Sequence, residues 1–265
     1  DEDKITVKGK RIDPHFKPEW SPDLLYSCNY MTHFSVIRKD IIDNLGGFKE
    51  GYDGSQDYDL FLKVTEVTDK IAHIPKVLYH WRMIPSSAAS STNAKPYAYI
   101  SAKKAIKDSL NRRGIEADVL DGPSLGLYRV KYKILGKPMV SIIIPTRDKA
   151  EVLKKCVQSI LGKTEWDNYE ILIIDNQSEE SETFRFYEEA KSNPKVRIAR
   201  YDESFNYSKI NNYAVSLIGS EYIVFLNNDT EVISREWLTA MLEHVQRKEV
   251  GVAGALLYYP NNTIQ

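Results

Sequence analysis

A short polar cluster, Asn227-Asn228-Asp229-Thr230, follows directly after the apolar run Tyr222–Leu226. The run suits a buried strand, and ligands of open parallel sheets bind just beyond the carboxyl ends of the strands. A carboxylate such as Asp229 at that position can hold a divalent cation against a phosphate-bearing ligand. Because Asn and Asp are also good turn formers, the cluster by itself fits a plain turn equally well.

Two other predicted strands also end in polar side chains. The three strand ends are Pro145-Thr146-Arg147, Asp175-Asn176 and Asn227-Asn228-Asp229, and Asn206, Asn211 and Asn212 lie in the connection before the last of them. Since the carboxyl ends of parallel strands meet at one edge of a sheet, these groups would converge on one crevice. One Asp there can accept from a base N–H or a ribose hydroxyl, and another can hold a metal on a diphosphate. The sequence therefore predicts the outline of a nucleotide-sugar site.

Another carboxylate, Asp57, lies at the start of a predicted helix whose expected N-cap is Ser55. Apolar residues follow Asp57 three, four and seven positions later, which places Asp57 on the inward face of the helix. Asp59 falls on a different face and is expected to see solvent. An inward carboxylate at a helix N-terminus is a candidate general base, although it also fits simple stabilisation of the helix end.

The segment 73–82 reads as a short strand that ends in His80, Trp81 and Arg82. His80 is a candidate metal ligand and Arg82 a candidate phosphate ligand. A lone His is more often an ordinary surface residue, so His80 alone does not establish a metal site. The small polar residues over 83–95 predict a mobile loop.

The elements that must position these groups change in character at Pro138. After it, strands and helices alternate with short links, which predicts a parallel, doubly wound α/β sheet with flanking helices. The expected strands are 139–144, 169–174, 196–200, 222–226 and a fifth candidate at 250–258. Neither GxGxxG nor GxxxxGK[ST] is present, which weighs against dinucleotide oxidoreductases and P-loop NTPases.

The first 137 residues are less regular. Their patterns predict a strand end and loop over 1–20, a β-compatible stretch at 29–37, a short helix at 41–45, a helix over 97–113 and two short strands within 115–137.

The composition is that of an ordinary soluble globular protein, with 42% apolar and 28% charged residues. A net charge of −1 gives no reason to expect nucleic acid as a partner. Cys28 and Cys156 are far apart and form no metal-type spacing, so they indicate a reducing compartment. No apolar run approaches the roughly 18 residues of a membrane span.

With these motifs in place, the sequence closely resembles the family 2 glycosyltransferases of the GT-A fold, especially two-domain bacterial enzymes of O-antigen and rhamnan synthesis. The second part carries the family's nucleotide-binding motifs in order: Val140–Arg147, Ile173–Ser178, Phe205–Asn212 and Leu226–Val232. The resemblance implies that Thr146, Arg147 and Asp175 face the base and ribose. The other residues predicted for the nucleotide-sugar site come from the strand ends, the connection before the last strand and the segment 73–82: Pro145, Asn176, Asn206, Asn212, Asn227, Asn228 and Arg82. The resemblance assigns Asp229 to a divalent metal, Mg²⁺ or Mn²⁺. The family's metal motif is Asp-x-Asp, and Asn227 replaces its first Asp, which puts metal dependence in question.

Residues 1–137 resemble the acceptor-binding half of the same family. Gly54–Leu60 is similar to its acidic motif, and the resemblance makes Asp57 the catalytic base, with Gln56 in place of the usual Glu. Tyr79–Arg82 is similar to the segment whose His reaches the metal, here His80. The acceptor half thus precedes the nucleotide half at 138–265, the reverse of their order in one domain.

Two arrangements explain this reversed order. The two parts could close into one circularly permuted domain, or they could be the back of one transferase domain followed by the front of the next. We favour the second arrangement, which places the base that serves the Asp229 crevice beyond Gln265.

The function expected from the resemblance is inverting transfer of a sugar from a nucleoside diphosphate sugar to a growing cell-surface polysaccharide or a lipid-linked glycan. The expected location is the cytoplasm, at the inner face of the plasma membrane, with peripheral association through the parent protein. One alternative is a non-catalytic module that binds a nucleotide sugar or a carbohydrate. A sugar nucleotidyltransferase fits less well, because Pro145–Asp148 is not the Gly-rich basic loop that a triphosphate needs.

Overall fold

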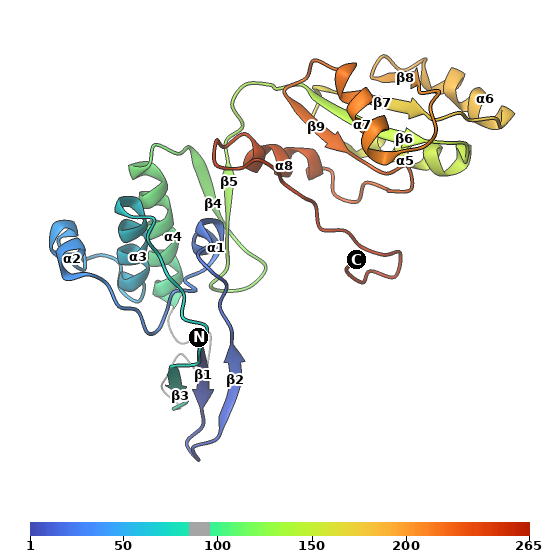
Figure 1. Cartoon of the computed structure of the whole chain (residues 1–265). Coiled ribbons are helices and arrows are strands. Elements are labelled where there is room, and N and C mark those ends of the chain that lie inside the picture. The colour runs from blue at the N-terminus through green and yellow to red at the C-terminus, as the bar shows by residue number, and fades with distance from the viewer. Residues whose placement is uncertain (85–95) are drawn as a thin grey trace. The chain divides into compact units, whose positions relative to one another are not determined.

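The computed structural model of the protein describes residues 1–84 and 96–265. The chain divides into two compact units, unit 1 (Asp1–Lys133) and unit 2 (Ile134–Gln265), within four residues of the change in character at Pro138. The loop expected over 83–95 lies outside the described residues except for its first two. Each unit is described by itself, with the element labels of Figure 1.

Unit 2 is built on a four-stranded parallel sheet, sheet C, in the order β8-β7-β6-β9 (Figure 1). Its strands are β6 (Val140–Thr146), β7 (Tyr169–Asp175), β8 (Val196–Arg200) and β9 (Tyr222–Phe225). β6 and β7 are almost entirely buried, as their continuous apolar runs predict for strands covered on both faces. The predicted α/β class with a parallel sheet and flanking helices is confirmed for this unit.

Helices cover both faces of sheet C. They are α5 (Ala150–Lys163), α6 (Ser181–Ala190), α7 (Tyr207–Ser216) and α8 (Trp237–Val245). α5, α6 and α8 pack on the face that carries Ile142 and Ile144 of β6. α7 packs on the opposite face, where Ile143 of β6 meets Ile210 and Ala214. Such a division is the pattern of a doubly wound sheet.

The fifth strand expected over 250–258 is not formed, and the prediction was wrong. Among the described residues of this segment, pairing is limited to an isolated bridge between Tyr258 and Ile264. The physical reason is the handedness of crossovers. The step from β8 to β9 passes through α7 on one face, whereas Leu238 and Leu242 of α8 pack on the other. A parallel strand placed outside β9 would therefore need a left-handed crossover, which is rare.

Strand β9 consequently has a free outer edge within the part of the chain that the structure describes. Phe225, whose partner in register on β6 is Ile143, is 52% exposed, although Ile143 itself is fully buried. The face of sheet C beneath α7 is therefore covered over β6 and left open over β9.

Unit 1 combines a small mixed sheet, a hairpin and four helices (Figure 1). Sheet A has the order β2-β1-β3, with β1 antiparallel to β2 and parallel to β3. The elements are β1 (Glu2–Ile5), β2 (Arg11–His15), β3 (Tyr79–Arg82), the hairpin strands β4 (Ala117–Asp121) and β5 (Tyr128–Tyr132), and helices α1 (Pro22–Ser27), α2 (Lys39–Leu45), α3 (Gln56–Val67) and α4 (Pro96–Arg112). The first 20 residues thus form two strands, more structure than the sequence predicted.

The β-compatible stretch at 29–37 forms no strand. Phe34 and Val36, the residues that suggested it, are 64% and 91% exposed. Alternating β-prone residues make a strand only where a neighbouring strand accepts their backbone hydrogen bonds, and none pairs with this segment among the described residues.

The core of unit 1 lies between α1, α3, α4 and the hairpin. Its largest fully buried members include Leu25, Tyr58, Leu62, Ile106 and Leu110. The Tyr58 hydroxyl donates to the backbone oxygen of Leu25, which satisfies its polar end inside the core. Helix α3 is therefore held on more than one side.

This packing overturns the predicted exposure of the two carboxylates of α3. Asp59 is completely buried and pairs with Lys63 one turn later, while Asp57 is only partly buried. The sequence pattern assumed one buried face, but every residue from Tyr58 to Val64 is buried. A helix surrounded by partners has no solvent face on which to place Asp59.

The buried pair yields a stability prediction. Lys63→Met leaves the buried Asp59 without its ion-pair partner, and should lower the free energy of unfolding of unit 1 by about 3–5 kcal/mol. Lys39→Met is the matched control, because it removes the Lys39–Asp43 pair, which has the same spacing but is exposed. Its effect should stay within about 0.5 kcal/mol. Urea denaturation of both variants measures the difference, and equal effects would show that Asp59 is not a buried charge.

None of the described helices has both the length and the apolar character required to cross a membrane.

Candidate functional site

The carboxyl ends of three strands of sheet C are joined by direct hydrogen bonds around Thr146. The backbone N–H of Asn176, just after β7, donates to the Thr146 backbone oxygen at 2.8 Å. The amide Nδ2 of Asn228, just after β9, donates to the Thr146 Oγ1 at 2.9 Å. The structure thus brings together the three strand ends that the sequence singled out.

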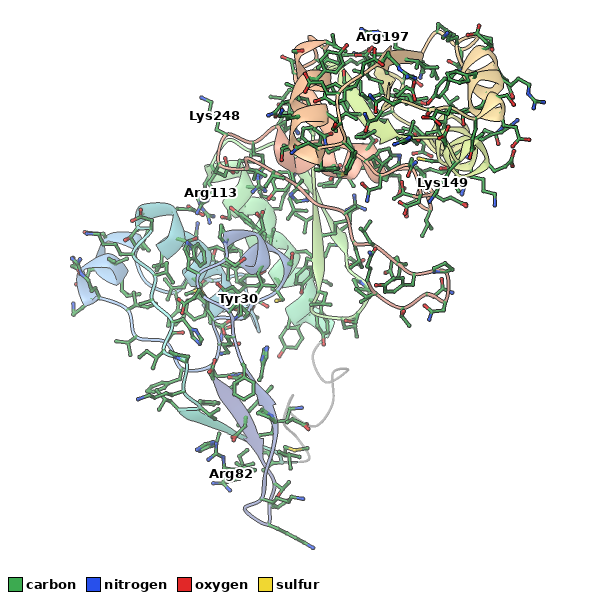
Figure 2. The ribbon with its side chains drawn as sticks, turned by 45° about the vertical axis from the view of Figure 1, so that its right-hand side comes forward. Tyr30, Arg82, Arg113, Lys149, Arg197 and Lys248 are labelled. Carbon is green, nitrogen blue, oxygen red and sulfur yellow. The ribbon has the colours of Figure 1, made fainter. Side chains whose placement is uncertain are left out.

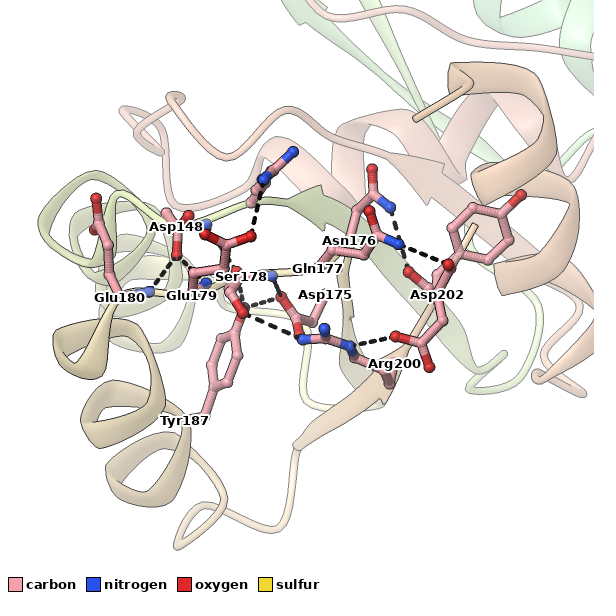
Figure 3. A network of polar contacts seen from close by, with 12 residues as sticks. Asp148, Asp175, Asn176, Gln177, Ser178, Glu179, Glu180, Tyr187, Arg200 and Asp202 are labelled. Atoms are coloured by element: carbon pink, nitrogen blue, oxygen red, sulfur yellow. Dashed lines mark hydrogen bonds and ion pairs between the residues drawn. The ribbon is translucent and has the colours of Figure 1, made fainter. Parts of the chain in front are cut away.

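Asp175, the last residue of β7, is buried and fully engaged (Figure 3). Its Oδ1 accepts from the Ser178 backbone N–H and the Tyr187 hydroxyl, both at 3.1 Å. Its Oδ2 accepts from Arg200 Nη1 at 2.5 Å. Burial by itself would raise the pKa of Asp175, but the hydrogen bonds from Ser178 and Arg200 outweigh it and hold the pKa below its usual value. In this structure Asp175 fixes the loop after β7.

A second carboxylate, Asp148, ties the loop after β6 to the loop after β7 (Figure 3). Its Oδ1 accepts from the backbone N–H groups of Glu179 and Glu180, at 2.8 and 2.9 Å. Its own N–H donates to Ser178 Oγ at 2.7 Å. Asp148 has a φ of 52°, in the left-handed region that Asp tolerates better than most residues. The loops at the carboxyl edge of sheet C are therefore cross-linked by polar side chains.

Sequence reasoning missed four members of this network: Asp148, Ser178, Tyr187 and Arg200. One signal could have found Arg200. It is the last residue of β8, and parallel pairing of equal strand ends puts it beside Asp175, its partner in register. Asp148 and Ser178 have no such signal, because their contacts depend on the loop conformations.

Two predicted ligands have structural partners. Asn176 Nδ2 donates to the backbone oxygens of Tyr201 and Glu203, at 3.2 and 2.9 Å, which positions the loop after β8. Asn206 is the N-cap of α7, and its Oδ1 accepts from the Lys209 N–H at 3.0 Å. Asn212 is exposed on α7. The contacts of Asn176 and Asn206 hold the loop after β8 and the start of α7, and a ligand role for the three residues stays a prediction.

The remaining predicted residues of unit 2 are accessible. Asn227 and Asp229 are exposed on the turn after β9, which Thr230 Oγ1 closes by donating to the Asn227 backbone oxygen at 3.0 Å. Pro145 is half-buried within β6. Arg147 is exposed and lies 3.5 Å from Glu179. The carboxylate of Asp229 is therefore free to meet a ligand that enters from solvent.

A divalent cation is compatible with this turn only if the ligand supplies most of its oxygens. Among the described residues, no three His, Cys, Asp or Glu side chains gather into a metal site. Asp229 offers one carboxylate, and Mg²⁺ commonly binds through one or two carboxylates plus substrate phosphates. The donor set therefore fits a cation that arrives with a diphosphate.

The predicted residues of unit 1 lie on α3 and β3. Asp57 Oδ1 accepts from the Tyr58 N–H at 2.8 Å in the first turn of α3, where the helix dipole favours a negative charge. His80 Nδ1 lies 2.5 Å from Asp3 Oδ1, which leaves Nε2 free of that contact. Arg82 is exposed at the end of β3 (Figure 2).

Asp3, the partner of His80, is itself buried and also accepts from Arg11 Nε at 2.5 Å. Burial alone would raise the pKa of Asp3, but the hydrogen bonds from His80 and Arg11 lower it. A carboxylate that accepts from Nδ1 fixes the orientation of the imidazole. Many metal-binding histidines are held by a carboxylate in this way. The arrangement is compatible with a ligand role for His80.

The Asp175 network leads to a pH prediction. Because the pKa of Asp175 is lowered in the folded state, its contribution is complete above the unfolded pKa of about 3.9 and is lost as the pH falls through the folded pKa. Asp175→Asn should therefore destabilise unit 2 by about 1–3 kcal/mol at pH 7 and by less near pH 3. Asp167→Asn is the control, since Asp167 is exposed before the amino end of β7. Denaturant titrations at both pH values test this, and an equal loss at the two would contradict it.

Comparison with known proteins gives these features a context. Residues 141–265 match the model of the family described as Glycosyl transferase family 2. Over the whole chain, the sequence is 45% identical to an uncharacterized protein of Sinorhizobium fredii and 39% identical to the O-antigen biosynthesis protein RfbC of Myxococcus xanthus. It spans 30% and 21% of those two proteins.

A third relative, the glycosyltransferase AglE of Haloferax volcanii, is 27% identical over 129 residues, which are 47% of this chain and 41% of that protein. The family match lies within unit 2 and includes the strands of sheet C except for Val140, the first residue of β6. Together with the parallel sheet, it confirms the predicted GT-A fold class for this unit.

Proposed function

We propose that unit 2 binds a nucleoside diphosphate sugar at the carboxyl edge of sheet C. The match of residues 141–265 to the family 2 glycosyltransferases supports this proposal. The observation that carries the proposal is the hydrogen-bonded meeting of three strand ends at Thr146. Ligands of doubly wound sheets bind at such an edge, near the point where the strand order reverses. In sheet C the order reverses at β6, the strand that ends in Thr146.

The polar side chains at this edge fit the donor's chemistry. Thr146 Oγ1, the Asn228 amide and the exposed Asn227 side chain offer donors and acceptors to a base or ribose. Arg147 supplies an exposed positive charge for phosphate oxygens. A divalent cation, when bound, would neutralise the leaving diphosphate, and Asp229 would be its protein ligand. In unit 1, His80 is the proposed ligand of a divalent metal and Arg82 the proposed ligand of a donor phosphate.

We propose that unit 1 is the acceptor-binding half and that Asp57 is the general base. The acceptor hydroxyl oxygen would attack the anomeric carbon as the bond to the diphosphate oxygen breaks, and Asp57 would take the hydroxyl proton. Attack from the face opposite the leaving group inverts the anomeric centre. That the two units derive from successive transferase domains stays a prediction.

The proposed acceptor is a growing cell-surface polysaccharide or a lipid-linked glycan, reached from the cytoplasm at the inner face of the plasma membrane. Similarity to a protein named for O-antigen biosynthesis supports this class of product.

Nucleotide binding tests the donor site. Calorimetric titration of the chain with UDP and with GDP, with and without Mn²⁺, should show binding of one of them that Mn²⁺ strengthens. Asp229→Ala should weaken binding about tenfold with Mn²⁺ present and leave it unchanged without the metal. Asp167→Ala, at the opposite edge of sheet C, should change neither value. Absence of binding by either nucleotide would refute the proposed donor site.

Turnover separates a transferase from the alternative, a non-catalytic module that binds the same ligand. With a panel of nucleotide sugars and glycan acceptors, release of nucleoside diphosphate should depend on the acceptor. In the intact parent protein, Asp57→Asn should lower that release by at least 100-fold and spare nucleotide binding, because it removes only the proton acceptor. Retained turnover in that variant would refute the base assignment, and nucleotide binding without turnover in the unmodified parent would favour the module.

A further inference from the structure

Unit 1 contains a hollow of about 450 Å³ at the amino end of helix α3. Its walls come from the segment 48–56, which joins α2 to α3, and from Tyr97 in the first turn of α4. The volume lies within the range of about 300–1,000 Å³ that is typical of small-molecule sites. The contacts described so far give this hollow no role.

Two aromatic rings face the hollow and remain open to solvent. Phe48 is 66% exposed and Tyr97 is 49% exposed, so neither ring is used in the core of unit 1. A large, rigid ring that is left accessible beside a concave surface provides an apolar contact area at low entropic cost.

Three polar side chains line the same hollow: Glu50, Asp53 and Gln56. Within the described residues, none of them makes a side-chain hydrogen bond or ion pair. They therefore offer carboxylate oxygens and an amide to a ligand rich in hydroxyl groups. Two carboxylates against one cation, Lys49, disfavour a phosphate or another anion.

The walls of the hollow are fixed to helix α4. Gly54 has a φ of 78°, and a Cβ at this position would lie 2.8 Å from the Ala98 Cβ, so the loop approaches the helix as closely as a glycine permits. Ser55 Oγ donates to the Ala98 backbone oxygen at 2.8 Å. Lys104 Nζ donates to the Gly51 backbone oxygen at 3.2 Å. The hollow is thus a preformed feature of the fold, as ligand sites usually are.

We propose that this hollow binds one sugar ring of the acceptor glycan, with Phe48 and Tyr97 against the C–H faces of the ring and Glu50, Asp53 and Gln56 accepting from or donating to its hydroxyls. The inference rests on the proposed function and adds to it the residues that select the acceptor. Gln56 lines the hollow, and Asp57 follows it in the first turn of α3. A ring held here lies at the helix end that carries the proposed base.

The test is direct sugar binding to the chain. Saturation-transfer NMR with methyl α-L-rhamnopyranoside, methyl α-D-mannopyranoside and N-acetylglucosamine should give a signal for at least one of them. Tyr97→Ala and Phe48→Ala should each lower that signal at least fivefold. Phe34→Ala and Ile100→Ala are matched controls, since both side chains are exposed apolar groups of unit 1 that do not line the hollow, and both should leave the signal unchanged.

Gly54→Ala provides a second variant that removes no lining side chain. Its Cβ would push the segment 48–56 away from α4, so it should also weaken sugar binding at least fivefold while Lys104→Met has a smaller effect. Thermal unfolding of each variant checks that unit 1 remains folded. The absence of a signal for all three sugars, or an unchanged signal in both aromatic variants, would overturn the proposal.

Titration with UDP and GDP separates this inference from the proposed function. Nucleotide binding without sugar binding overturns the role of the hollow and leaves the donor site standing. Sugar binding that depends on Phe48 and Tyr97, without nucleotide binding, supports the hollow and refutes the proposed donor site.

Discussion

The hydrogen-bonded register of the parallel strands in sheet C is the constraint on which the candidate donor site depends. In that register Thr146 is the partner of Asp175, and Asp175 is the partner of Arg200, so three strands end in one row. A slip of one residue would turn each of these side chains to the other face of the sheet. The register is fixed in turn by the buried apolar runs of β6 and β7, since moving either run would expose its core-facing residues. Packing in the centre of the sheet thereby determines polar chemistry at its edge.

Much of unit 2 was predictable because its signals are local and repeated. Continuous apolar runs mark the buried strands, and strand ends in a parallel sheet must meet, so Thr146, Asp175 and Asn228 could be grouped from the sequence. The loop network could not be grouped in this way. Asp148 joins the network through a left-handed backbone conformation, and Ser178 joins it through a contact between loops. Neither feature produces a periodic pattern in the sequence. The absent strand at 250–258 reflects a global rule, the handedness of a crossover, which no window of sequence contains.

In unit 1 the sequence was less informative because tertiary contacts decide more of the structure. Asp59 and Asp57 are two residues apart on one helix, yet one is a buried partner of Lys63 and the other lies at an accessible helix end. Helical periodicity predicts which residues share a face of the helix, but it does not predict how many of those faces are covered by other elements. The hollow beside α3 depends likewise on the approach of Gly54 to α4, a contact between segments far apart in the chain.

The bare edge of β9 has a practical meaning for the behaviour of unit 2 in solution. Unpaired N–H and C=O groups along a strand are a template for any other extended chain, and native proteins usually blunt such edges with charges, prolines or bulges. The strand Tyr222–Phe225 contains none of these, and it presents Ile223 and Phe225 to solvent. Among the described residues, the open edge therefore belongs to the strand from which the Asn227–Asp229 turn emerges, so pairing of another extended chain with β9 would act on the segment proposed to meet the donor.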